Sequence, residues 1–207
     1  MLRDLLTRLF GTPVGPAVSG SAPVPEQRHI VRGIPVAVVN ERPDIATADA
    51  LTRLSEALAL IDRYAPRRLR RLSHDVAEIW VRRFPCRAAF YPEPRACLIE
   101  LTFLVNPKHT AAEVASSLVH EGVHARVARV GARVGPEGKA REERLCRQAE
   151  LEFGLALEAV PGRDVVVERA RQSLLLADQE VAPEIDWSVA ARRVADADRT
   201  SQGQGSV

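Results

Sequence analysis

The sequence predicts an α+β fold that is mostly α-helical, with a small antiparallel β-sheet packed beside one central helix. Two observations predict it: long segments carry apolar residues three and four positions apart, and only a few short β-prone runs stand between them. Of the 207 residues, 46% are hydrophobic and 27% are charged, which is typical of a soluble globular protein. This length fits one domain with a full hydrophobic core.

The ends of the chain differ in composition from its middle. Residues 1–10, MLRDLLTRLF, have leucines at helical spacing and predict a short amphipathic helix. Residues 11–27 are rich in Gly, Pro and Ser and predict a flexible linker. We therefore expect a single domain over residues 28–195, followed by a disordered tail at 196–207.

The first elements of the expected domain are a strand and two helices. The β-branched run at 29–39 predicts a strand, which Pro35 confines to an edge or a bulge. Apolar residues at helical spacing predict a helix over 48–64, and Pro66 opens a second one that continues to Ile79. One face of this second helix is rich in arginine, with Arg82 and Arg83 just beyond it.

A hairpin and the remaining helices follow. Two β-prone runs flank Tyr91-Pro92-Glu93-Pro94, and the second run predicts a strand over 96–105. Thr110 and Glu113 form a capping-box pattern that predicts a helix from about 110 to 130. We expect a loop over 131–139, a helix over about 140–159, a long helix after 163, and a shorter one around Trp187.

Charge and cysteine content limit the classes of function. The formal net charge is +2, so no global attraction to nucleic acid or to an anionic membrane is expected. Three cysteines with no short-range pair favour a reducing compartment, and we expect a cytoplasmic protein. No stretch approaches the roughly 20 apolar residues that a membrane span requires.

The motif that carries chemistry is HEGVH, residues 120–124. His120 and His124 are four residues apart, so a helix places both imidazoles on one face, where they can bind one small cation. Both would lie on the inward half of the helix, where their ring nitrogens need partners. A catalytic zinc site needs a third protein ligand, and a helical hairpin would bring the segment REERLCRQAE alongside.

HEGVH, followed after eighteen residues by Glu143, resembles the gluzincin class of zinc metallopeptidases. The resemblance covers about 40 residues and implies Zn²⁺ as the cofactor, with His120, His124 and Glu143 as its ligands. It also implies that Glu121 is the base that takes a proton from zinc-bound water. The chain departs from larger gluzincins at Arg147, where they place an acidic residue that orients a histidine. Glu150 would have to serve instead.

The helical wheel leaves the third ligand open. If Leu145, Ala149 and Phe153 form the core stripe of their helix, Glu142 falls near its centre and Glu143 at its margin. We retain Glu143, because an active site lies at the edge of a core and the family spacing agrees. Glu142 and Glu150 remain alternative ligands or outer partners of the histidines.

The resemblance implies a hydrolase, a metallopeptidase that cleaves a peptide or protein substrate. In this class the substrate backbone usually pairs with an edge strand beside the active-site helix, which here would be 96–105. The oxyanion needs a further donor, for which the candidates are Tyr91, His109, Arg141 and Arg144.

Three alternatives stay open. The histidines could be ordinary residues of a metal-free helical interaction module. The zinc could be purely structural, with His109 or Cys146 as a fourth ligand. The arginine-rich segment 67–83 could bind nucleic acid, although solvated arginine faces are commoner. Substrate specificity and oligomeric state do not follow from the sequence.

Overall fold

The computed structural model describes residues 24–131 and 135–182, together with residues 186, 188–190, 192 and 194–196. One compact unit spans Pro25–Pro183, and all the elements below belong to it. Both ends of the chain are assigned to a second unit, of which only Val24 and the last few described residues are characterised. The helix predicted at 1–10, most of the linker, Trp187 and the tail beyond Asp196 lie outside the described residues.

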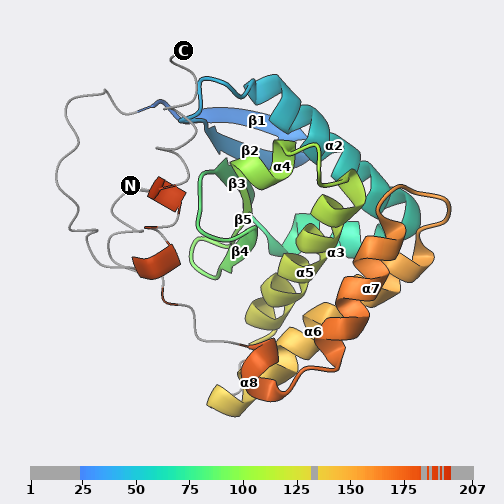
Figure 1. The fold of residues 1–207 in the computed structure, drawn as a ribbon. Helices are drawn as coiled ribbons and strands as arrows, with labels where there is room; N and C mark the ends of the chain where they lie inside the picture. Colours follow the sequence, from blue (N-terminus) through green and yellow to red (C-terminus); the bar gives the residue numbers. More distant parts are fainter. Residues whose placement is uncertain are drawn as a thin grey trace. The chain divides into compact units, whose positions relative to one another are not determined.

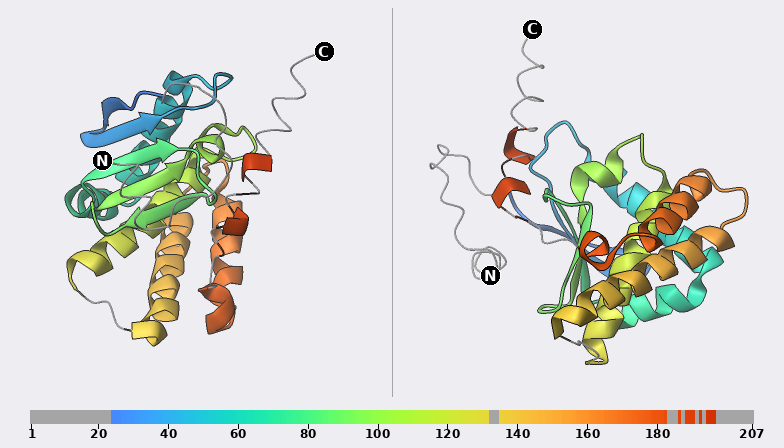
Figure 2. Two further views of the ribbon diagram at one scale, coloured as in Figure 1. Left: turned by 90° about the vertical axis from the view of Figure 1, so that its left-hand side faces the viewer. Right: turned by 60° about the horizontal axis from the view of Figure 1, so that its bottom comes forward.

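The α+β fold is confirmed. A five-stranded sheet has the order β1-β2-β3-β5-β4, and helices cover one side of it (Figures 1 and 2). The strands are β1 (Gln27–Val31), β2 (Ile34–Val39), β3 (Glu78–Arg82), β4 (Ala88–Tyr91) and β5 (Ala96–Glu100). The antiparallel sheet that we predicted is wrong in its centre: β2 pairs with β3, and β3 with β5, in parallel. The sheet is mixed because the helices between β2 and β3 form a crossover connection.

The predicted strand at 29–39 is in fact a hairpin. Its turn consists of Arg32 and Gly33, with φ of 48° and 80°. A non-glycine residue at positive φ is uncommon, so the sequence gives little sign of this turn. Pro35 pairs with Ile30 of β1, and the pairing of β2 with β3 begins at Val36. The missing N–H of the proline therefore removes no hydrogen bond between β2 and β3.

The third strand replaces the end of a predicted helix. Helix α2 (Thr47–Tyr64) and the start of α3 (Pro66–Asp75) agree with the prediction, but α3 ends before Val76. Ile79, which continued the helical spacing, lies in β3 at the centre of the sheet. A short strand buried on both faces lacks the polar alternation that would separate it from a helix. The segment 67–83 therefore does not form a single arginine-rich helix.

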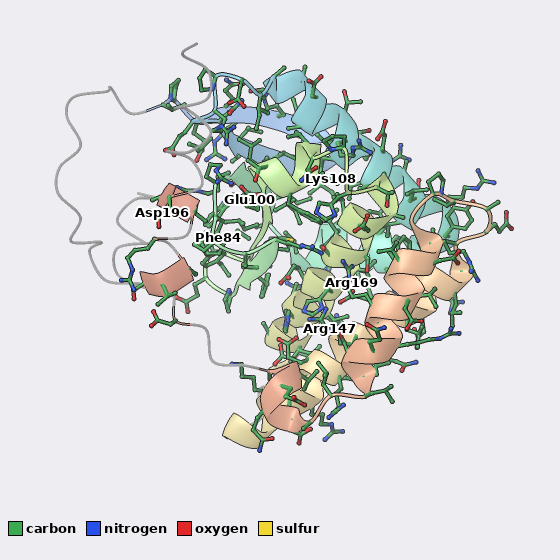
Figure 3. All side chains as sticks on the ribbon, viewed as in Figure 1. Phe84, Glu100, Lys108, Arg147, Arg169 and Asp196 are labelled. Carbon is green, nitrogen blue, oxygen red and sulfur yellow. The ribbon has the colours of Figure 1, made fainter. Side chains whose placement is uncertain are left out.

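The β4–β5 hairpin is confirmed, with Tyr91 opposite Ala96. However, the strand predicted to run to Val105 ends at Glu100, and the chain turns into the short helix α4 (Leu101–Val105). The side chain of Glu100, labelled in Figure 3, accepts a hydrogen bond from the Phe103 backbone N–H at 2.6 Å. This N-cap starts the helix directly after the strand.

Helix α5 (Ala111–Arg129) begins at the predicted capping box of Thr110 and Glu113, and Gly131 follows its end at a φ of 68°. Helix α6 (Gly135–Ala156) begins within the segment predicted as a loop. Helices α7 (Arg163–Leu174) and α8 (Asp178–Val181) complete the compact unit. In the described part of the chain no helix is long and apolar enough to cross a membrane.

Helix α5 is the centre of the helical layer, because it contacts α2, α3 and α6 as well as β4 and β5 (Figure 1). Gly122 lies where α5 meets α3: a Cβ there would be 3.3 Å from Leu72 Cδ1. This glycine therefore serves helix packing. The face of α5 that carries the histidines meets α6, where Glu142 contacts His124 and Glu150 contacts His120.

Candidate metal centre

The two histidines of α5 converge on one point. The Nε2 atoms of His120 and His124 lie 3.1 Å apart, and their ring centroids lie 4.9 Å apart. This arrangement follows from the spacing of four residues, which stacks the two side chains on one helix face. His120 is buried and His124 is half-buried.

Helix α6 brings the carboxylate of Glu143 to the same point. Its Oε2 lies 3.4 Å from His120 Nε2, and its Oε1 lies 3.4 Å from His124 Nε2. Cys146, one helical turn further on, places its Sγ 3.5 Å from His124 Nε2. Four potential donor groups thus come together from two adjacent helices.

Two further carboxylates hold the opposite ring nitrogens. Glu150 Oε1 lies 2.6 Å from His120 Nδ1, and Glu142 Oε1 lies 2.7 Å from His124 Nδ1. A carboxylate on Nδ1 fixes the ring orientation and leaves Nε2 as the free ligand atom. Glu142 and Glu143 therefore both face the histidines, but only Glu143 approaches the Nε2 side.

Glu150 is itself held from three directions. It is 1% exposed, and it accepts hydrogen bonds from Ser116 Oγ at 3.0 Å and from Arg147 Nη1 at 2.6 Å. The guanidinium of Arg169 on α7 lies 3.5 Å away (both arginines are labelled in Figure 3). Arg147, the residue that departs from the gluzincin pattern, thus positions the carboxylate that holds His120.

The cluster binds protons tightly when no cation is present. Burial lowers the pKa of His120, but the carboxylates of Glu143 and Glu150 outweigh it and raise that pKa to about 10. Burial raises the pKa of Glu143, but the charges of His120 and His124 outweigh it and hold that pKa well below its usual range. The carboxylates therefore favour positive charge between the rings.

Glu121 lies beside this cluster on the sheet side of α5. It is 6% exposed, and no hydrogen bond to its side chain occurs among the described residues. Burial raises its pKa, which the charges of His120 and His124 partly offset. Its charge also influences the pKa values of Tyr91 and Cys97 in the β4–β5 hairpin.

This arrangement can hold a metal ion. The ligand atoms of His120, His124 and Cys146 all lie within 4.8 Å of one another. Imidazole and thiolate both bind transition metals. The sequence alone offers Cys146 only as an alternative ligand. Cys146 follows Glu143 by three residues, which places both side chains on the same face of a helix. This spacing is the feature of the sequence from which its position in the cluster could be predicted.

The proposed oxyanion donors are spread more widely. Tyr91 lies within electrostatic reach of Glu121. His109 bonds to Glu113 at the start of α5, which is two helical turns, or roughly 10 Å, from His120 along the helix. Arg141 is exposed, and Arg144 binds Asp178 and the Leu174 carbonyl between α7 and α8. Of the four candidates, the described contacts bring only Tyr91 near Glu121.

The edge strand beside the cluster is not the one predicted. β5, at 96–100, lies between β3 and β4 and is interior. β4 is the outer strand of the described sheet at this end, and it contacts α5. The hairpin places its first arm outside because the second arm pairs in parallel with β3.

Comparisons with protein-family models, with curated proteins and with solved structures found no match to this chain.

Proposed function

We propose that this protein is a zinc-dependent hydrolase, a small metallopeptidase that resembles the gluzincins. The observation that carries the proposal is the convergence of three side chains: the Nε2 atoms of His120 and His124 lie 3.1 Å apart, with a Glu143 oxygen 3.4 Å from each.

The separations agree with tetrahedral zinc. Zinc binds imidazole nitrogen and carboxylate oxygen at about 2.0–2.1 Å, and tetrahedral angles then place any two ligand atoms about 3.3–3.4 Å apart. The two Nε2 atoms lie 3.1 Å apart, and each Glu143 oxygen lies 3.4 Å from one of them, Oε2 from His120 and Oε1 from His124, so the carboxylate faces both rings. Two nitrogens and a carboxylate oxygen are also donors that zinc prefers.

The outer carboxylates support a metal rather than two ordinary histidines. If the imidazoles were only buried side chains in need of a hydrogen bond, one polar partner for each ring would be enough. Here each Nδ1 has its own carboxylate while each Nε2 faces the other ring and Glu143. This arrangement presents both Nε2 lone pairs to a common cation.

When bound, zinc would acidify a water molecule and polarise the carbonyl of the substrate. The carboxylate of Glu121 would accept a proton from the attacking water as its oxygen bonds to the carbonyl carbon. Glu121 would then donate that proton to the amine nitrogen as the C–N bond breaks. Burial of Glu121 beside the histidines, with no hydrogen bond to its side chain among the described residues, leaves it able to perform this transfer.

We infer that β4 aligns the substrate. An edge strand offers unpaired backbone groups to an extended peptide, and β4 is the outer strand that contacts α5. This is the basis for preferring an extended peptide over a compact small molecule as substrate.

The test compares unmodified protein with Glu121→Gln after both are loaded with one equivalent of zinc. Casein and a mixture of unstructured peptides serve as substrates, and new amine termini are counted. We expect Glu121→Gln to retain zinc while hydrolysis falls by about 10²–10⁴-fold, the range of general acid–base catalysis. Glu152→Gln, an exposed change on α6, is the matched control and should hydrolyse normally. Equal hydrolysis by Glu121→Gln would contradict the proposed role.

A further inference from the structure

Cys146 lies on the same face of α6 as Glu143, one turn further along. Its Sγ is 3.5 Å from His124 Nε2, and it lies within 4.8 Å of the ligand atom of His120. The side chain of Cys146 is fully buried. Together with the two histidines and Glu143, Cys146 makes four potential donors, which is one more than a catalytic zinc site uses.

We infer that Cys146 is a fourth protein ligand, which closes the metal centre and holds the enzyme latent. This inference rests on the proposed zinc site. Structural zinc sites have four protein ligands, whereas catalytic sites keep one position open for water. A centre with two histidines, Glu143 and Cys146 would therefore bind zinc firmly, and water would reach the ion only in the small fraction of molecules in which Cys146 has left it.

The distance to His124 supports this ligation. A zinc–sulfur bond of about 2.3 Å and a zinc–nitrogen bond of about 2.05 Å, at the tetrahedral angle, place sulfur and nitrogen about 3.5–3.6 Å apart. The observed Sγ–Nε2 distance is 3.5 Å. Cys146 and Glu143 both approach His124 Nε2 from α6, so the sulfur can complete the ligand set that the two histidines and Glu143 begin.

The other two cysteines lie outside the cluster. Cys97 is buried within the sheet, and Cys86 donates a hydrogen bond from its thiol to the Ala88 carbonyl. Burial raises the pKa of both thiols, that of Cys86 to about 12, which disfavours the thiolate that a metal would bind. Neither belongs to the group of possible ligands found among the described residues.

Displacement of Cys146 would open the centre. Rotation about its Cα–Cβ bond would turn the sulfur away from the ion and leave His120, His124 and Glu143 as ligands. That set with one open position is the one that hydrolysis requires. Activity of the protein would then depend on the state of a single thiol.

The test replaces zinc with Co²⁺ in unmodified protein, in Cys146→Ala and in Cys86→Ala. Thiolate ligation to Co²⁺ gives a charge-transfer absorption in the near ultraviolet, so its presence can be read without any activity. We expect the band in unmodified protein and in Cys86→Ala, and its loss in Cys146→Ala, which should still bind one Co²⁺ per chain. A band that survives in Cys146→Ala, or that is missing from the unmodified protein, would overturn the inference.

Hydrolysis by the zinc forms tests the closure separately. Cys146→Ala should cleave casein faster than the unmodified protein, by about tenfold or more if the open form is rare. Equal rates in the two proteins would overturn the closure. If neither protein cleaves any substrate while the cobalt band behaves as expected, Cys146 is a ligand of a structural zinc and the proposed hydrolase function has failed.

Discussion

His120 and Glu150 are joined by a 2.6 Å contact between Nδ1 and Oε1, although thirty positions separate them in the chain. This contact fixes the ring so that Nε2 points toward His124 and Glu143. Because Arg147 and Ser116 hold Glu150 in turn, the orientation of a proposed metal ligand depends on a buried network that spans α5, α6 and α7.

Replacing Glu150 by Gln should weaken zinc binding without removing any ligand. Loss of an outer carboxylate typically costs about 10–100-fold in metal affinity, because the imidazole becomes less basic and less well oriented. Competition with a chromogenic chelator measures the affinity, and Glu152→Gln is the exposed control on the same helix. An unchanged affinity would show that Glu150 has only a structural role.

Glu143→Gln and Glu142→Gln should separate the two adjacent carboxylates. Glu143 approaches both Nε2 atoms, so its replacement removes a ligand and should abolish stoichiometric zinc binding at micromolar concentrations. Glu142 contacts only Nδ1 of His124, so its replacement should weaken binding by about 10–100-fold. The reverse order of effects would assign Glu142 as the ligand.

The stability of the zinc-free protein should depend on pH in both directions. The pKa of His120 is raised from 6.5 to about 10 in the folded protein. Protonation of His120 therefore adds fully to the free energy of unfolding below pH 6.5, and this stabilisation is lost as the pH rises toward 10. Burial raises the pKa of Glu150, but His120 outweighs it and lowers that pKa from 4.5 to about 2. Ionised Glu150 therefore adds fully to the free energy of unfolding above pH 4.5, and this stabilisation is lost as the pH falls toward 2.

The free energy of unfolding of the zinc-free protein should therefore be highest between pH 4.5 and 6.5. Urea unfolding at several pH values, in the presence of a chelator, measures this. A maximum above pH 8 would contradict the proton-binding cluster. Added zinc should abolish the decline at high pH, because the cation replaces the protons and binds better as they leave.

Gly162 should be intolerant of substitution. Its φ is 87°, and a Cβ there would overlap Thr110 Oγ1 and lie 2.9 Å from Thr110 Cβ, at the cap of α5. Gly162→Ala should lower the free energy of unfolding by about 2–4 kcal/mol, from left-handed strain plus the disturbed cap. Gly131→Ala is the matched control: its φ is 68° but it has nothing within 4 Å, so only the strain of about 1–2 kcal/mol remains.

The sequence predicted the helices better than the strands. Helix α2 has a long apolar period and α5 has a capping box, and both are local signals. The strand β3 was missed because its residues continue the spacing of α3, and only pairing with distant β2 and β5 makes it a strand. The end of β5 was missed because the capping contact of Glu100 depends on a side-chain geometry that propensity does not show.

The site was predictable where the chemistry is local. The spacing of His120 and His124 fixed their common face, and the hairpin of α5 and α6 brings Glu143 to them. The helical wheel of α6 was misjudged: Leu145, assigned to the core, is 51% exposed, whereas Cys146 and Glu150 are buried. Their inward direction depends on how α6 rotates against α5, which no local pattern determines.

Above all, we propose that His120 and His124 bind zinc. Elemental analysis of purified protein after dialysis against a mild chelator tests it, with His120→Ala measured alongside. We expect about one zinc per chain in the unmodified protein, and none in the variant, since a single ion in a site of this kind needs both histidines. No zinc in the unmodified protein, and no uptake when zinc is added, would contradict the account.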